Sequence, residues 1–324
     1  MKKLSLILSG LVLLSTLSFG ANKVLKLADN HAEDYPTVLG DKEFARLVEE
    51  RSNGKIRVDI YAGGQLGSEE NTIEQVQFGA IDMVRTSISP LTRYSDKFNV
   101  LMLPYLYSSD THMFKVLDGN IGLEYLNLLK DINITGLAWF DSGARNFYNS
   151  KKLIKKPEDM RGLKIRVQES ELMMELINAL GASPTPMSFG EVYGALQTGV
   201  IDGAENNTPS YDSTSHFEVA KFYTIDEHTR IPEMLIINTD TLNSLSPEEQ
   251  SIIRLSAFDA AKKQREFWKE RENISMKKIK SNKNVEIYKF TDNDKKVFQD
   301  KVKPLYEAFA KPYLKDVERI INEK

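Results

Sequence analysis

The chain has 324 residues, with 43 basic and 46 acidic side chains and no cysteine. The slight acidic excess argues against nucleic acid or an anionic membrane surface as partner, and the missing cysteines exclude disulfides, thiolate chemistry and a lipid-modified cysteine. A chain of this length buries a large core and usually divides into two domains.

Residues 1–20 carry the pattern of a secretory signal peptide. Lys2 and Lys3 precede an apolar run that is too short to span a bilayer comfortably, and small residues follow before Ala21. We therefore expect cleavage before Ala21 and a mature protein in the periplasm of a diderm bacterium; an uncleaved membrane anchor is the alternative. Beyond residue 20, 41 basic residues face 46 acidic ones, a formal charge of −5. An anionic ligand would then be held by a few placed arginines.

Two segments, 67–89 and 187–210, repeat one pattern of a serine, a helix of about three turns, a glycine and an Ile-Asp pair that opens a strand. The serines are expected as helix N-caps and the glycines as left-handed residues that end the helices. The paired positions are Ser68 and Ser188, then Gly79 and Gly199. Short strands alternating with helices indicate βαβ units with parallel strands, so we predict two α/β domains that face each other across a cleft.

Polar residues follow the strands predicted in both segments. The stretch RGLKIRVQES, residues 161–170, alternates apolar and polar side chains and is predicted as a strand that carries Arg166. Arg85 ends a strand in the first repeat, and Asn206 and Asn207 follow a strand in the second. In open α/β sheets ligands bind at the carboxyl ends of strands, so these side chains are candidates for a ligand cleft.

A long helix is predicted near the end of the chain. Ser246 is its expected N-cap, Pro247 its first residue and Glu249 the partner in a capping box, and neither Gly nor Pro interrupts the pattern before Lys280. Such a helix is roughly 50 Å long, longer than one small domain, so it is expected to pack on both domains. The alternative is a pair of helices with a break near Asn273.

No enzyme motif is present: the sequence has no P-loop, no G-x-G-x-x-G, no H-E-x-x-H and no G-x-S-x-G. None of the four histidines, His31, His112, His216 and His228, has metal-ligand spacing to another. We therefore predict a protein without cofactor, metal site or enzymatic activity.

Residues 161–207 resemble the solute-binding proteins of TRAP transporters, the DctP-type family. The resemblance rests on GLKIRVQ, on PTPMSFGEVYGALQTGVIDG and on the asparagine after it, which occur together and in order. YAGGQLGSEENTIEQVQFGAIDM, NVLMLPYLY and the long helix extend it along the chain. It implies a two-domain α/β periplasmic binding protein with a ligand cleft between the domains and a long helix spanning both.

The expected domains alternate along the chain: domain I comprises 21–144 with 230–272, and domain II comprises 145–229 with 273–324. The family implies one organic acid bound in the cleft and delivered to ion-gradient-driven membrane subunits, with no ATP hydrolysis by the chain itself. A free monomer is the simplest carrier.

The resemblance also assigns ligand contacts. Arg166 is implied to bind a carboxylate through two parallel hydrogen bonds, a geometry that lysine cannot copy. Asn206 is implied to donate to the same carboxylate, Phe189 to form an apolar wall, and Arg145 to lie near the ligand. Further contacts are expected from position along the chain: His31, Glu70, Arg85, Asn207 and Tyr211.

One carboxylate clamp surrounded by hydrogen-bonding groups suits a polyhydroxylated monoacid. The run AENNTPSYDSTSHFEVAKFYTIDEHT is most similar to family members that bind hexuronates such as D-glucuronate or D-galacturonate. Sialic acid, a keto acid and a C4-dicarboxylate, which would need a second clamp, are alternative ligands. A secreted enzyme on uronate polysaccharide and a periplasmic sensor subunit are alternative functions. His31 and Tyr211 could instead belong to the core, and Glu227 and His228 to the hinge.

Overall fold

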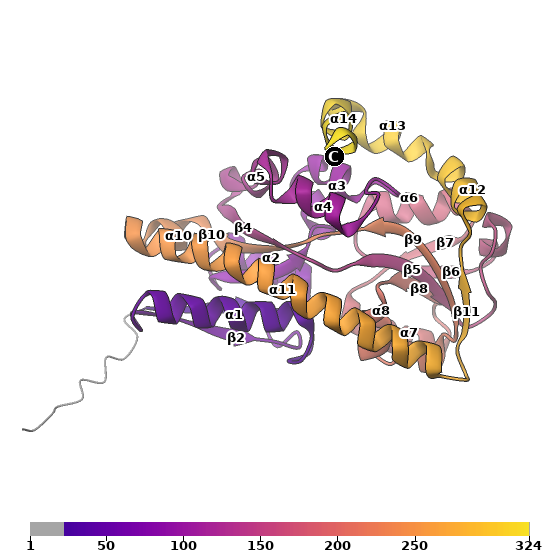
Figure 1. Ribbon diagram of the computed structural model, residues 1–324, viewed down its shortest axis with the longest axis horizontal. Helices are drawn as coiled ribbons and strands as arrows, with labels where there is room; N and C mark the ends of the chain where they lie inside the picture. The colour runs from indigo at the N-terminus through magenta and orange to yellow at the C-terminus, as the bar shows by residue number, and fades with distance from the viewer. Residues whose placement is uncertain (1–22, 324) are drawn as a thin grey trace, which may run out of the picture.

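The structure is a computed structural model that describes residues 23–323 (Figure 1). The signal peptide expected at residues 1–20 lies outside these residues. The described chain forms two β-sheets with helices around them, and the long helix α11 crosses both halves.

The first sheet has five strands in the order β2-β1-β3-β10-β4. Their bounds are β1 Lys23–Ala28, β2 Ile56–Tyr61, β3 Met83–Ser87, β4 Ile134–Phe140 and β10 Glu233–Asn238. The second sheet has six strands in the order β11-β9-β5-β8-β6-β7. Their bounds are β5 Ala144–Asn149, β6 Lys164–Val167, β7 Ser183–Pro186, β8 Gly203–Asn206, β9 Phe222–Arg230 and β11 Glu286–Lys289. Each sheet supplies one of the two domains expected from the sequence.

Helices cover both sheets. The N-terminal half has α1 Pro36–Arg51, α2 Glu69–Gln77, α3 Asn99–Met102, α4 Asp110–Leu117 and α5 Asn120–Leu126. The middle of the chain has α6 Glu171–Leu180, α7 Val192–Thr198, α8 Thr208–Ser213 and α9 His216–Val219. The C-terminal part has α10 Thr239–Asn243, α11 Pro247–Ser281, α12 Asp292–Val302, α13 Pro304–Ala310 and α14 Leu314–Asn322.

The predicted internal repeat is confirmed in detail. Gly79 and Gly199 end their helices in the left-handed region, with φ of +73° and +75°. The aspartate of each Ile-Asp pair binds a backbone N–H of the neighbouring strand: Asp82 accepts from Lys26 within β1 at 2.8 Å, and Asp202 accepts from Lys164 at the start of β6 at 2.9 Å. The same local arrangement, a glycine that ends the helix and an aspartate that binds the neighbouring strand, therefore occurs in both halves.

The sheets are mixed, which differs from the purely parallel units expected. β1 pairs in parallel with β2 and β3, and β6 with β7 and β8, as predicted. β10 instead runs antiparallel to β3 and β4, and β5 runs antiparallel to β8 and β9. The reason is the crossover: the chain leaves the first sheet after β4 and returns to it after β9, so β5 and β10 enter from the other half.

Helix α11 begins at a capping box, in which Ser246 accepts from the Glu249 N–H and Glu249 accepts from the Ser246 N–H. It continues for 35 residues without a break at Asn273. It packs on α1 and β4 in one half and on α8 in the other, and Figure 1 shows it crossing the front of both. The predicted single helix on both domains is confirmed.

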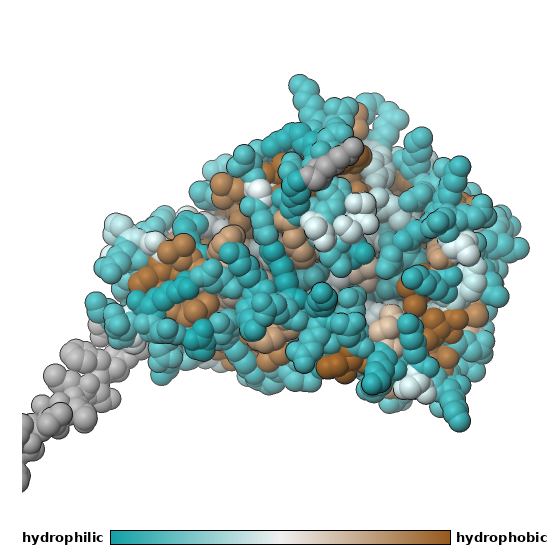
Figure 2. Space-filling model, viewed as in Figure 1, coloured by the Kyte–Doolittle hydropathy of each residue, from teal (hydrophilic) through white to brown (hydrophobic). Residues whose placement is uncertain are grey.

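The surface is largely hydrophilic. Figure 2 shows teal side chains over most of one face, with separate hydrophobic patches among them. No helix within residues 23–323 combines the length and the apolar character that crossing a bilayer requires.

Candidate functional site

A cavity lies between the two sheets, and side chains from both halves line it. The space among these side chains, counted together with adjoining open solvent, is about 360 Å³. The first half contributes Asn30, His31, Tyr35, Thr37, Glu69, Ser142 and Glu233, and the second contributes Arg145, Arg166, Gln168, Phe189, Asn206, Asn207 and Ser210. Because the strands β6 and β8 end at this cavity and helices α1 and α8 begin there, it occupies the position expected for a ligand in α/β sheets.

The two halves touch each other around the cavity. The Tyr35 hydroxyl bonds to the Ser210 hydroxyl at 2.8 Å and donates to Asn207 Oδ1 at 3.2 Å. Deeper in the cleft, Ser89 donates to Gln168 Oε1 at 2.8 Å. The structure is thus a closed arrangement of the cleft.

Arg166 is a buried cation without a counterion. Its side chain is 2% exposed, and its Nε and Nη2 both donate to the Met187 carbonyl, at 2.9 and 2.7 Å. No carboxylate oxygen of the described chain lies within 4.0 Å of its guanidinium. Burial and the nearby Arg145 cation lower the pKa of Arg166, although the Glu205 charge opposes them. Burying an unpaired charge costs free energy, so we expect an anion from outside the chain to pair with Arg166.

Arg145, in contrast, is neutralised inside the protein. It donates to Glu205 Oε1 and to the Glu205 carbonyl, each at 2.8 Å, and its Nε also bonds to Glu205 Oε2. Burial would raise the pKa of Glu205, but Arg145 and His228 outweigh it and hold the pKa at about 2.

This ion pair also orients Asn206. Its Oδ1 accepts from Arg145 Nη1 at 3.0 Å and from the Asn207 N–H at 2.9 Å. With the oxygen engaged by two donors, the amide NH₂ is left to face the cavity that Asn206 lines. Arg166 and Asn206 therefore present N–H donors from neighbouring strands to one region of the cavity.

The wall formed by the first half is acidic. Arg85 is fully buried behind it and donates to Glu233 Oε2 at 2.5 Å, to Glu69 Oε1 at 3.1 Å and to both oxygens of Asp29. Glu69 and Glu233 themselves line the cavity. Burial and the negative charges of Glu69 and Asp29 raise the pKa of Glu233 to about 7, although Arg85 opposes them.

Aromatic rings close one side of the cavity. His31 stacks on Tyr35 with ring centroids 4.0 Å apart, and Phe189 lies 5.0 Å from His31 across the cleft. Burial and the Arg85 charge lower the pKa of His31. His31 Nδ1 lies 2.7 Å from Arg85 Nη2 and 3.2 Å from Asp29 Oδ1.

Six of the predicted ligand contacts come together in this cavity: Arg166, Asn206, Arg145, His31, Phe189 and Asn207. Three lie elsewhere. Arg85 stands behind the acidic wall. Glu70 is partly exposed and turned toward Arg93 at 3.5 Å, so its neighbour Glu69 takes the place in the cavity. Tyr211 is in the core, where it stacks on Tyr223 with ring centroids 4.6 Å apart and donates to the Ala220 carbonyl at 2.7 Å.

Glu227 and His228, for which the sequence left a hinge role and a ligand contact open, are not part of the cavity lining. His228 bonds to Asp226 at 2.8 Å and lies 3.4 Å from Glu205, and Glu227 pairs with Lys295 at 2.9 Å. Eight lining residues escaped the sequence analysis: Asn30, Tyr35, Thr37, Glu69, Ser142, Gln168, Ser210 and Glu233. One signal was available, because Glu233 is a lone carboxylate at the start of the apolar strand EMLIIN.

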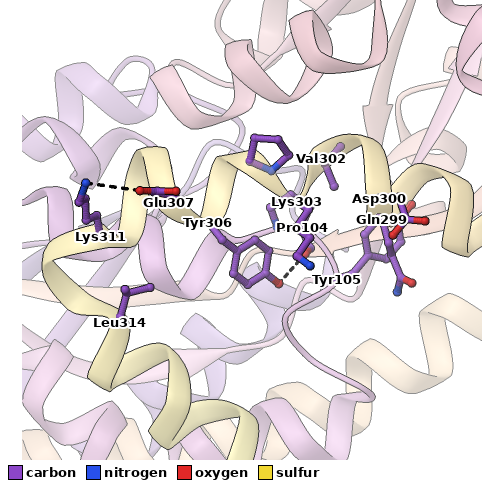
Figure 3. Close-up of a pocket in the computed structure, with 11 residues that line it drawn as sticks. Pro104, Tyr105, Gln299, Asp300, Val302, Lys303, Tyr306, Glu307, Lys311 and Leu314 are labelled. Atoms are coloured by element: carbon purple, nitrogen blue, oxygen red, sulfur yellow. Dashed lines mark hydrogen bonds and ion pairs between the residues drawn. The ribbon is translucent and has the colours of Figure 1, made fainter.

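A second, more open groove runs over α12, α13 and α14 (Figure 3). Tyr306 donates to the Pro104 carbonyl at 2.8 Å and Lys311 pairs with Glu307 at 3.4 Å, whereas the buried Tyr105 hydroxyl has no partner among the described residues. It offers no buried unpaired charge comparable to Arg166, so the cavity between the sheets is the better candidate site.

Comparison with known proteins agrees with this geometry. The model of the DctP family, described as bacterial extracellular solute-binding protein, family 7, matches residues 27–312. A solute-binding protein of Chromohalobacter salexigens is 38% identical over 87% of this chain and 83% of its own length.

Solved structures match as well. A TRAP periplasmic solute-binding protein from a Bradyrhizobium species, in complex with D-galacturonate, is 43% identical with a TM-score of 0.89, covering 92% of this chain and 99% of its own. One from Roseobacter denitrificans with bound β-D-glucuronate is 39% identical with a TM-score of 0.88, covering 92% of this chain and 98% of its own.

Proposed function

The chain belongs to the DctP family of bacterial extracellular solute-binding proteins, and we propose that it captures a hexuronate, D-glucuronate or D-galacturonate, between its two sheets and delivers it to the membrane subunits of a TRAP transporter. It is a binding protein of a transport system and not an enzyme. The expected export signal and the periplasmic relatives support a periplasmic location.

The observation that carries the proposal is the unpaired cation of Arg166. The ligand carboxylate binds its guanidinium through two parallel hydrogen bonds and takes a third from the Asn206 amide. Asn207 and Arg145 border this anion position. In this arrangement the ligand carboxylate is the counterion of Arg166, which explains why the protein itself does not neutralise this arginine.

The rest of the cavity suits a sugar. Glu69 and Glu233 accept hydrogen bonds from hydroxyl groups, and Thr37 and Ser210 can both donate and accept. His31, Tyr35 and Phe189 provide flat surface for the C–H faces of a pyranose ring. The crystallised relatives bind sugar acids of this kind, which supports hexuronates over smaller organic acids.

A panel of ligands tests the proposal. Thermal unfolding of the mature protein is followed with glucuronate, galacturonate, gluconate, sialic acid, succinate, pyruvate and glucose, because a ligand that binds only the folded state raises Tm. Hexuronates are expected to give a large shift and glucose none, since glucose lacks the carboxylate for Arg166. A shift with succinate or pyruvate alone would reject the hexuronate and keep the family.

A further inference from the structure

The wall that the first half contributes to the cavity holds more carboxyl groups than cations. Three carboxylates, Asp29, Glu69 and Glu233, contact the single guanidinium of Arg85. A fourth carboxyl, Asp41 on α1, is fully buried, and neither of its oxygens has a hydrogen-bond partner in the described structure. Burial and the nearby Asp29 raise the pKa of Asp41, which favours its neutral form. One cation then faces three ionisable carboxylates.

Two of these carboxylates keep an oxygen free for the cavity. Glu69 Oε1 accepts from Arg85 at 3.1 Å and from the Ser87 N–H at 3.0 Å, and Glu233 Oε2 accepts from Arg85. The other oxygen of each makes no hydrogen bond to residues 23–323, and both side chains line the cavity. Arg85, the cation behind them, is already engaged by Asp29, Asn30, Glu69 and Glu233.

We propose that Glu69 and Glu233 make this cavity selective for acids with a single carboxylate, so that it rejects aldarates, which carry a carboxylate at each end of the same six-carbon skeleton. The inference rests on the proposed function and adds a specificity determinant to it. With one carboxylate on Arg166, the far end of the ligand meets Glu69 and Glu233. A hydroxyl there donates a hydrogen bond; a carboxylate has no proton to donate and faces like charge.

The size of the effect follows from Coulomb's law. Repulsion between two like charges about 4 Å apart at an effective dielectric constant of 20 corresponds to several hundred-fold in affinity, and Arg85, which is bonded to both carboxylates, offsets part of it. Solvent that enters with the ligand weakens this repulsion. We therefore expect the wild-type protein to bind D-galacturonate at least about 100-fold more tightly than galactarate.

The test is isothermal titration of the mature protein with galacturonate, with galactarate and with galactonate. Galactonate is the matched control ligand, because it is open-chain like galactarate and replaces one of its carboxylates by a hydroxymethyl group. It is expected to bind more tightly than galactarate. In the double variant Glu69→Gln/Glu233→Gln the preference for galacturonate over galactarate should fall at least tenfold, whereas Glu70→Gln, on the same helix but outside the cavity, should leave it unchanged.

The outcomes separate the two proposals. If the wild type binds no hexuronate, the proposed function fails and this inference falls with it. If it binds galacturonate and galactarate within a few-fold of each other, or if the double variant keeps the wild-type preference, the hexuronate function stands and the acidic wall is not its selector.

A measurement on the wild type covers the case in which the double variant does not fold. Because the pKa of Glu233 is about 7, lowering the pH from 8.5 to 5.5 adds a proton to the wall. The charged and titratable groups that act on Glu233 are Arg85 on β3, Asp29 after β1, Glu69 on α2, Arg145 on β5 and Asp41 on α1. Both ligands stay ionised, since ordinary carboxyl pKa values are about 4. The preference for galacturonate should fall several-fold at the lower pH; a constant preference would overturn the inference.

Discussion

Two arginines in the cavity differ in what balances their charge. Arg145 has Glu205 as an internal counterion, whereas Arg166 has only the Met187 carbonyl. Arg145 can therefore orient Asn206 in the absence of a ligand. Arg166, in contrast, obtains its counterion from the ligand carboxylate. The family resemblance placed both Arg145 and Arg166 near the ligand. Their different hydrogen-bond partners in the structure indicate that they have different roles.

Removal of the Arg166 side chain should abolish most of the affinity. Loss of one partner of a buried charge pair costs about 2–5 kcal/mol, so Arg166→Ala is expected to weaken hexuronate binding roughly 30- to several-thousand-fold in calorimetry. Arg166→Lys should also bind poorly, because a single ammonium cannot form two parallel bonds. Arg161→Ala, at an exposed position near the same strand, is the control. Binding of Arg166→Ala within a few-fold of wild type would contradict the clamp.

His228 makes the stability pH-dependent. Burial lowers its pKa, but Asp226 and Glu205 outweigh burial and raise the pKa from 6.5 to about 9. A raised pKa of the folded state means that the stabilisation is fully present below about pH 6.5 and is lost as the pH rises through about 9. Urea unfolding should show wild type exceeding His228→Gln by roughly 2–3 kcal/mol at pH 6 and by little at pH 10. An equal difference at both pH values would contradict a charged His228.

The sequence predicts some site residues and misses others for a physical reason. Arg166 and Asn206 stand at strand ends inside recognisable local patterns. Glu69 and Glu70 are neighbours on one helix, so their directions differ by about 100° and only the tertiary partner decides between them. That partner is Arg85, whose own charge is balanced by Asp29 and Glu233, and these residues are far apart in the chain.

At the scale of elements, α1 and α11 approach each other through a glycine. A Cβ at Gly40 would lie 2.7 Å from Gln264 Cγ and 2.8 Å from the Phe140 ring. Gln264 in turn binds the connection between β4 and β5. Its side chain accepts from the Asp141 N–H at 2.8 Å and donates to the Asp141 carbonyl at 2.9 Å. The close approach therefore couples the long helix to the connection between the sheets.

Gly40→Ala should destabilise the fold by about 1–3 kcal/mol, the usual range for overpacking, even though alanine favours a helix. Gly194→Ala in α7 is the matched control, because a Cβ there has no neighbour within 4 Å. It should stabilise the protein by about 0.5–1 kcal/mol. Urea unfolding measures the stability of both variants. Equal stability of the two would show that the α1–α11 contact accommodates a methyl group at residue 40.

Local signals explain which elements the sequence could predict. The caps of α2 and α11 and the glycines that end α2 and α7 are set by a few adjacent residues, so these boundaries were predictable. The antiparallel direction of β5 and β10 depends on where the chain crosses between the sheets, which no short pattern records.

At the scale of the whole molecule, closure is held by contacts that involve neither Arg166 nor Asn206. The Tyr35 hydroxyl reaches across the cleft to Asn207 and Ser210, and the Tyr35 ring meets Trp268 of α11 edge-on at 5.9 Å. Tyr35 thus joins the two halves and the long helix at one point.

Tyr35→Phe should weaken binding about tenfold, chiefly through faster dissociation, because it leaves the buried Ser210 hydroxyl without its partner at a cost of about 1–3 kcal/mol. Asn207 Oδ1 loses the Tyr35 bond and keeps the Ser210 N–H at 2.7 Å. Stopped-flow tryptophan fluorescence measures the rate, since Trp268 lies beside the changed residue. Tyr61→Phe, on edge strand β2, should dissociate as the wild type does. An unchanged dissociation rate for Tyr35→Phe would show that the Tyr35 hydroxyl does not help to keep the cleft closed.

The most direct measurement is a crystal structure of the mature protein with D-glucuronate. The account predicts the ligand carboxylate within hydrogen-bond distance of the Arg166 guanidinium and the Asn206 amide, with ligand hydroxyls on Glu69 and Glu233. A carboxylate turned toward Glu69 and Glu233, or a ligand outside the cavity between the sheets, would contradict it.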